Sequence, residues 1–116
     1  MAEKQDMPRS EWKNYFEQMT KAHDGGTVTI EVLDMEFGDG LEAAQLPFKY
    51  IEYDPKGDDF IVAVGGRDGQ FPVALRHIVE HPRTILVDHI ESSSAKEDAV
   101  DVVGADGSQT IVTIRP

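Results

Sequence analysis

Two histidines in the second half of the chain have a spacing that could support metal chemistry. His77 and His81 flank Ile78-Val79-Glu80 in a His-x-x-Glu-His pattern. When this pattern lies in a helix, as in some zinc peptidases, both imidazoles reach one metal and the glutamate activates water. Pro82 follows immediately and would limit any helix there. We therefore favour surface histidines over a peptidase site.

A simpler zinc or nickel site is a second interpretation of these residues. It would use His77, His81 and His89 with Asp88, because imidazole and carboxylate groups suit both metals. The site requires that the histidines point the same way, which a strand around His77 does not ensure. His77, His81 and His89 are thus the only metal candidates, and histidines without a metal are favoured over them.

No other pattern in the chain indicates an active site. Ser92-Ser93-Ser94 lies near His89 but lacks the strand-turn-helix elbow that activates a nucleophile. Gly65-Gly66-Arg67-Asp68-Gly69 is not followed by Gly-Lys-Ser/Thr, so it predicts a hairpin turn rather than a phosphate-binding loop. Two acidic runs do not match the ligand spacing of an EF-hand and predict solvated turns. They are Asp34, Glu36, Asp39 and Glu42, and Asp54, Asp58 and Asp59. We expect no catalytic residue, no cofactor and no enzymatic activity.

The charge balance argues against several classes of partner. The 116 residues include 22 acidic and 11 basic side chains, for a formal net charge of −11. Such a surface repels the phosphates of nucleic acids and the head groups of anionic membranes. No cysteine is present, and no apolar run approaches the roughly 20 residues that span a bilayer. Residues 1–7 lack the apolar core of a secretory signal, so we expect a cytoplasmic protein without nucleic-acid or membrane partners.

The polarity pattern divides the chain into a tail and one domain. Residues 1–9 predict a flexible N-terminal segment, and residues 10–116 predict a single helix-plus-β domain. Ser10 is the expected N-cap of a helix over 11–22, and Asp24-Gly25-Gly26 is the signal that ends it.

The predicted helix carries an aromatic stripe. Trp12, Phe16 and Met19 lie at i, i+4 and i+7, with Tyr15 beside them. The stripe could dock another protein, but a lone amphipathic helix beside several strands normally packs on their sheet. We favour packing on the sheet.

After residue 26 the pattern predicts short strands joined by turns. Tyr53-Asp54-Pro55-Lys56-Gly57-Asp58-Asp59-Phe60 places a Pro/Gly/Asp turn between two β-rich segments and predicts a hairpin. Pro47 cannot donate to a ladder, so we expect a break or bulge there. Segment 73–79 fits a strand or a short helical turn, and we favour the strand. The expected strands are 27–32, 41–53 with its break between 42–46 and 48–53, 60–64, 73–79, 84–89, 100–103 and 110–114, with a polar surface loop over 91–98.

The order of these elements indicates the fold class. Consecutive strands without intervening helices argue for a mostly antiparallel sheet. The predicted fold is α+β, with one N-terminal helix packed on about six or seven short strands that form a small barrel or a strongly curled sheet.

Several turns and core residues resemble those of a known family in their order. They are Arg9-Ser10-Glu11-Trp12, Leu46-Pro47-Phe48, the Tyr53-Asp54-Pro55 turn, His81-Pro82-Arg83 and the closing Val103-Gly104-Ala105-Asp106-Gly107. Because these segments follow one another in this order, the chain resembles an uncharacterised bacterial family of short single-domain proteins, domain of unknown function family 5335. The resemblance implies a bacterial single-domain protein and carries over no catalytic or binding residue.

Two binding roles are compatible with these residues. The favoured one is a non-enzymatic protein-interaction or regulatory module that presents a sheet edge or hairpin tip to a protein partner or to its own copy. The alternative is a small-molecule-binding or metal-binding protein that uses a barrel interior or the region of His77, His81 and His89.

Overall fold

A computed structural model of the chain describes residues 5–23, 25–34, 38–65, 75–91 and 96–115. Within these residues it contains a short 3-10 turn, one α-helix and eight strands, of which β1 has only two residues. The elements are β1 (Gln5–Asp6), η1 (Arg9–Glu11), α1 (Trp12–Ala22), β2 (Thr27–Asp34), β3 (Gly38–Asp54), β4 (Asp59–Val64), β5 (Leu75–Glu80), β6 (Pro82–Glu91), β7 (Lys96–Gly104) and β8 (Gln109–Arg115). No helix in these ranges is long and apolar enough to cross a membrane.

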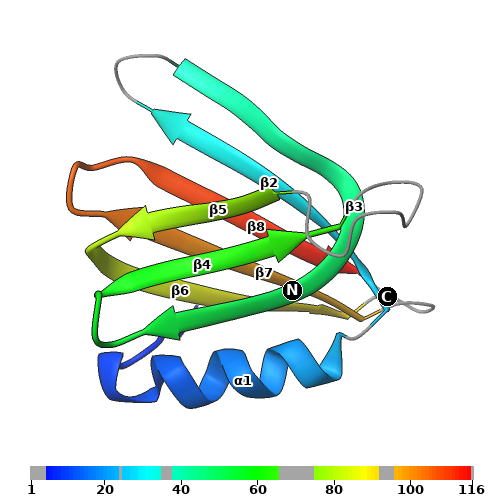
Figure 1. The fold of residues 1–116 in the computed structure, drawn as a ribbon, viewed down its shortest axis with the longest axis horizontal. Coiled ribbons are helices and arrows are strands. Elements are labelled where there is room, and N and C mark those ends of the chain that lie inside the picture. Colours follow the sequence, from blue (N-terminus) through cyan, green and yellow to red (C-terminus); the bar gives the residue numbers. More distant parts are fainter. Residues whose placement is uncertain (1–4, 24, 35–37, 66–74, 92–95, 116) are drawn as a thin grey trace.

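The strands form one antiparallel sheet with the order β1-β6-β7-β8-β2-β3-β4-β5 (Figure 1). Every neighbouring pair is antiparallel. The predicted α+β fold with one N-terminal helix and an antiparallel sheet is confirmed. The sheet stays open rather than closing into a barrel, because β1 and β5 end it on its two sides.

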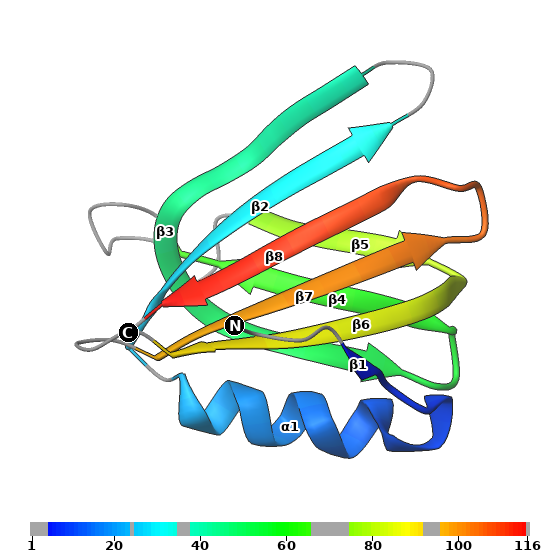
Figure 2. The ribbon, with the colours of Figure 1, turned by 180° about the vertical axis from the view of Figure 1, so that it is seen from behind.

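β3 joins two parts of this sheet. Its first half pairs with β2, where Thr27 lies opposite Pro47, and its second half pairs with β4, where Phe48 lies opposite Val64. The register shifts on both sides of Pro47, and Gln45 has a φ of 50°. The bulge expected at Pro47 is therefore confirmed. Figures 1 and 2 show β3 bending in this region, and β5 is brought against β7 and β8.

α1 packs its aromatic stripe on the sheet, as the sequence predicts. Trp12, Phe16 and Met19 are buried. The ring centroids of Phe16 and Phe60 lie 5.3 Å apart in an edge-to-face arrangement. The hydroxyl of Thr20 donates to the carbonyl of Ile51 at 2.8 Å and accepts from its N–H at 3.1 Å. The helix therefore supplies both apolar burial and a substitute hydrogen-bonding partner for β3.

The remaining core comes from alternate positions of strands in both parts of the sheet. In β8 buried and half-buried side chains alternate, as a period of two requires, whereas Val62, Ala63 and Val64 at the end of β4 are all buried. The buried strand residues include Val28, Ile30, Phe60, Val62, Ile85, Val87, Val100, Val102, Val112 and Ile114.

The two ends of α1 differ in how well the sequence predicts them. Ser10 is not the N-cap: it lies in η1, and α1 begins after Glu11 without a side-chain cap. Pro8 starts this turn, because its carbonyl accepts the N–H of Glu11 at 2.9 Å. At the other end Gly25 has a φ of 86°, which confirms a glycine stop. A Cβ on Gly26 would lie 2.3 Å from the Arg115 carbonyl oxygen, so only glycine fits there.

Two segments that the sequence assigns to flexible or solvated regions pack against the domain. The sequence predicts a flexible tail over 1–9, but its described part pairs with β6, and the Met7 N–H donates to the Ile85 carbonyl at 2.9 Å. The loop predicted over 91–98 is too long, because β7 already begins at Lys96. Glu97 accepts from Arg115 at 2.9 Å, so a neighbouring strand offsets its charge.

Both predicted hairpins are present. β3 and β4 meet at the turn of residues 55–58, and β7 and β8 meet at residues 105–108. The ambiguous segment 73–79 is a strand over its described part, from Leu75 onward. Most of the predicted turn at 65–69 lies outside the described residues.

Replacement of Phe16 by Ala tests the packing of α1. We expect Phe16→Ala to lower the free energy of unfolding by about 3–5 kcal/mol, because it removes a fully buried ring beside Phe60. Urea unfolding followed by circular dichroism measures the change. Gln18→Ala, on the exposed side of the same helix, is the matched control and should change stability by less than about 0.5 kcal/mol. A loss below about 1 kcal/mol for Phe16→Ala would contradict this packing.

Candidate functional site

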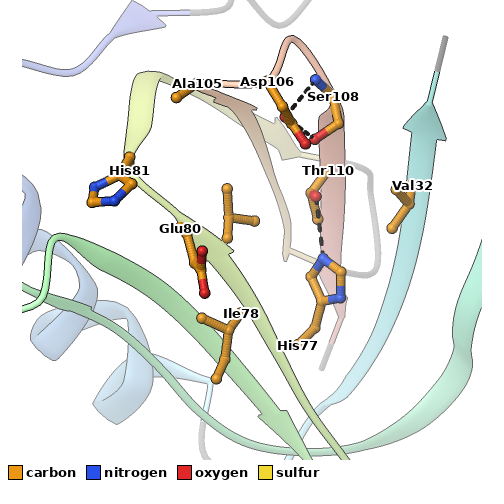
Figure 3. Close-up of a pocket in the computed structure, with 10 residues that line it drawn as sticks. Val32, His77, Ile78, Glu80, His81, Ala105, Asp106, Ser108 and Thr110 are labelled. Atoms are coloured by element: carbon orange, nitrogen blue, oxygen red, sulfur yellow. Dashed lines mark hydrogen bonds between the residues drawn. The ribbon is translucent and has the colours of Figure 1, made fainter. Parts of the chain in front are cut away.

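A cavity of about 350 Å³ lies beside β5, between this strand and the β7–β8 turn (Figure 3). Its wall is mixed, with six polar side chains and four apolar ones. The polar residues are His77, Glu80, His81, Asp106, Ser108 and Thr110, and the apolar residues are Val32, Ile78, Val79 and Ala105. Residues from β2, β5, β8 and the β7–β8 turn therefore meet at one hollow.

The alternation of β5 decides which of its residues enter the interior. Along this strand His77 is half-buried, Ile78 is exposed and Val79 is buried, because successive side chains point to opposite faces. His77 Nε2 lies 3.2 Å from Thr110 Oγ1 on β8, and Thr110 is buried (Figure 3). This hydrogen bond links the two parts of the sheet.

His81 forms the one-residue connection between β5 and β6. It has a φ of 52°, in the left-handed region that non-glycine residues seldom adopt. Its N–H donates to the Asp58 carbonyl at 2.8 Å, and its Nδ1 lies 3.2 Å from Asp58 Oδ2. Asp58 also has a positive φ, of 54°. Two strained residues thus hold each other at the corner where the chain leaves β5.

Asp58 is the centre of a wider polar network. Tyr53 Oη donates to Asp58 Oδ1 at 2.6 Å, and Arg9 Nη1 donates to the same oxygen at 2.9 Å. Arg9 Nη2 donates to the Pro82 carbonyl at 2.8 Å. The hydrogen bond from Tyr53, and then those from His81 and Arg9, outweigh desolvation and hold the pKa of Asp58 below its usual value. Burial, together with the hydrogen bond to Asp58, raises the pKa of Tyr53.

The structure brings together only two of the three predicted metal candidates. His77 and His81 line the same cavity, although the helical geometry of the His-x-x-Glu-His pattern is absent, because β5 is a strand. His89 lies near the far end of β6, eight residues beyond His81, and an extended strand of that length spans roughly 26 Å. Asp88 precedes it on the same strand. The side chains that the structure describes contain no group of three or more histidines and carboxylates able to hold one metal ion.

The acidic run at the β3–β4 turn is built as the sequence predicts. Asp54 Oδ1 accepts the N–H of Lys56 at 3.0 Å, as a turn-forming aspartate does, and Asp58 belongs to the network described above. The turn predicted for the other acidic run is wrong for three of its residues, because Asp34 ends β2 and Asp39 and Glu42 lie in β3; Glu36 lies outside the described residues.

Sequence reasoning missed the outer edge of β5. In the described residues β5 pairs with β4 alone, which makes it the end of the sheet. Its outward residues are Arg76, Ile78 and Glu80, and all three are exposed. Ile78 is 49% exposed and is the one large hydrophobic side chain exposed in the described part of the chain. The charged residues Arg76 and Glu80 on either side of Ile78 were the available signal, but the free edge is a property of the whole sheet.

Removal of the Tyr53 hydroxyl tests the network around Asp58. In Tyr53→Phe we expect the pKa of Asp58 to rise toward its usual value, because the hydrogen bond that lowers this pKa most is lost. A lowered carboxyl pKa stabilises the fold above the unfolded pKa, and this stability is lost as pH falls through the folded pKa. The variant should therefore be less stable than the wild type near about pH 7, and the difference should shrink below about pH 3.

Carbon-detected NMR titration of the Asp58 carboxyl and urea unfolding at both pH values make this measurement. Tyr50→Phe is the control, since Tyr50 lies three residues from Tyr53 on the same strand and faces the opposite side. An unchanged Asp58 pKa in Tyr53→Phe would show that Tyr53 does not stabilise the carboxylate.

Similarity to known proteins identifies a family but no activity. The chain is similar to an uncharacterised protein from the bacterium Aquifex aeolicus (strain VF5), with 31% identity over 110 residues, which are 95% of this chain and 90% of the relative. No solved structure matches it. The match to the family of unknown function DUF5335 covers residues 3–116, and the chain belongs to this family.

Proposed function

We propose that this protein is a non-enzymatic protein-interaction module that binds an extended strand at the edge of β5. The observation that carries the proposal is that β5 ends the sheet and bears the exposed Ile78. An edge strand offers unpaired backbone N–H and C=O groups to an incoming strand, whatever its side chains. Ile78 adds an apolar contact at the middle of that edge.

Two other places along the edges of the sheet are covered by contacts within the chain. The N-terminal residues pair with β6 at Val87 and Leu86, and Thr20 of α1 satisfies the backbone of Ile51 on β3. These contacts obstruct strand addition at those residues, although the first half of β3 pairs with β2 alone and also keeps one side open in the described residues. Within the described residues, no comparable contact covers β5 on its outer side.

The cavity beside β5 supplies a means of selecting the incoming strand. In strand addition, main-chain hydrogen bonds provide affinity, while pockets next to the edge choose among alternate side chains. Ile78 and Glu80 line the cavity as well as His77 and Val79, but His77 and Val79 lie on the more buried face of β5. Alternate side chains of an added strand would face inward beside them, at the mouth of this cavity.

The charge of the chain supports a protein as the partner. A formal net charge of −11 repels nucleic acids and anionic lipid surfaces, as noted from the sequence. Backbone pairing at a strand edge does not depend on that charge. A cytoplasmic location remains a prediction.

Substitution of Ile78 by Lys tests the proposed edge. Peptides selected from a displayed random library on the immobilised full chain should protect the amides of Leu75–Glu80 from hydrogen exchange. We expect Ile78→Lys to weaken their binding about tenfold or more, since an edge lysine opposes strand addition. Gln18→Lys adds the same charge on the exposed side of α1 and should bind as the wild type does. Selected peptides that bind while leaving the β5 amides unprotected would overturn the proposal.

A second candidate function, binding of a metal or small molecule, is favoured by the cavity and its two histidines. Under this function an excess of Zn²⁺ or Ni²⁺ raises the Tm, because a ligand that binds only the folded state stabilises it. His77→Ala should abolish the rise, while replacement of the exposed Gln18 by Ala should retain it. A Tm unchanged by either metal, measured by differential scanning fluorimetry, would remove the metal-binding form of this function.

A further inference from the structure

The exposed side chains of β5 can complement those of a second β5 in charge. Arg76, Ile78 and Glu80 occupy every second position of the strand, so they lie in a row on the exposed face. The row has a cation at one end, an apolar residue in the centre and an anion at the other end, so reversing its direction exchanges the two charges. Such a row matches a second copy of itself when the two run in opposite directions.

We propose that the partner strand is β5 of a second copy of this chain, paired antiparallel about a twofold axis at Ile78. This inference rests on the proposed function and names its partner. The pairing sets Ile78 opposite Ile78, and it sets Arg76 of each copy opposite Glu80 of the other. Cross-strand pairs of apolar residues and of opposite charges both stabilise a sheet. A twofold axis repeats every contact that lies off the axis. The pair of Arg76 with Glu80 therefore occurs twice, on either side of the single Ile78–Ile78 contact on the axis.

The arrangement of residues selects this register over its neighbours. A shift by two residues would place Ile78 opposite a charged residue, Arg76 or Glu80, and would break at least one ion pair. A shift by one residue would place outward side chains opposite inward ones, since the side-chain period is two. The register centred on Ile78 therefore satisfies all three outward residues at once.

The high net charge makes this local complementarity necessary. Two copies that each carry a formal charge of −11 repel one another at long range. At a physiological ionic strength of about 0.15 M this repulsion is screened beyond roughly 8 Å, whereas directly opposed side chains still interact. The two pairs of Arg76 with Glu80 and the central Ile78 contact then decide whether the copies associate.

Charge reversal at β5 tests both the dimer and its register. Sedimentation equilibrium of the full chain, over micromolar to submillimolar concentrations, should show a wild-type dimer of two chains. We expect Arg76→Glu or Glu80→Arg alone to raise the dimer Kd roughly tenfold or more, because each creates two like-charge pairs. The double variant Arg76→Glu/Glu80→Arg should restore the wild-type Kd, since every pair is present again with its charges exchanged.

A second charge swap provides the matched control. Lys13 and Glu17 form an exposed ion pair on α1, with Nζ 3.5 Å from Oε1. Lys13→Glu, Glu17→Lys and their double variant repeat the same changes of charge away from β5 and should leave the Kd of the dimer unchanged. Circular dichroism of each variant checks that the fold is retained.

The outcomes separate this inference from the proposed function. A wild type that stays monomeric, or a dimer that is unaffected by single reversals or not rescued by the double variant, overturns the β5–β5 pairing. If library peptides nevertheless protect the β5 amides in an Ile78-dependent way, the proposed strand addition stands with a different partner. A monomer that also fails to bind any peptide at β5 overturns both.

Discussion

The change of partner in β3 at Pro47 is the constraint on which the rest of this structure depends. One strand of 17 residues pairs with β2 before the proline and with β4 after it. Pro47 lacks the N–H that a regular ladder uses, and the register shifts beside it. Because β3 bends here, β4 and β5 are carried over β7 and β8, and their facing side chains make the core that α1 covers.

The sheet remains open, so its unpaired strand edges need other partners or stay exposed. Thr20 of α1 satisfies the backbone of Ile51 on β3, and the N-terminal strand pairs with β6. β5 ends the sheet with Ile78 exposed. Uncovered strand edges are templates for pairing. The exposed Ile78 on this uncovered edge is what directs the functional interpretation to β5 and its cavity.

A polar network secures the corner from which β5 departs. Arg9, Tyr53, Asp58 and His81 come from the N-terminal turn, β3, the hairpin tip and the β5–β6 connection. Asp58 and His81 both adopt left-handed backbone conformations, which persist when surrounding contacts determine them. The network therefore ties the β5–β6 connection to the N-terminal turn and to the β3–β4 hairpin through residues that lie far apart in the sequence.

The local elements of this fold could be predicted from the sequence, whereas the way they meet follows from long-range pairing. The stripe of Trp12 and Phe16, the hairpin turn before Phe60 and the bulge at Pro47 were predictable, because periodicity and turn chemistry act over a few residues. The pairing of β2 with β8, the contact of His77 with Thr110 and the open edge at Ile78 were not. Side-chain alternation specifies which face of a strand is buried but not which strand lies beside it, and a free edge exists only when all other pairings have been made.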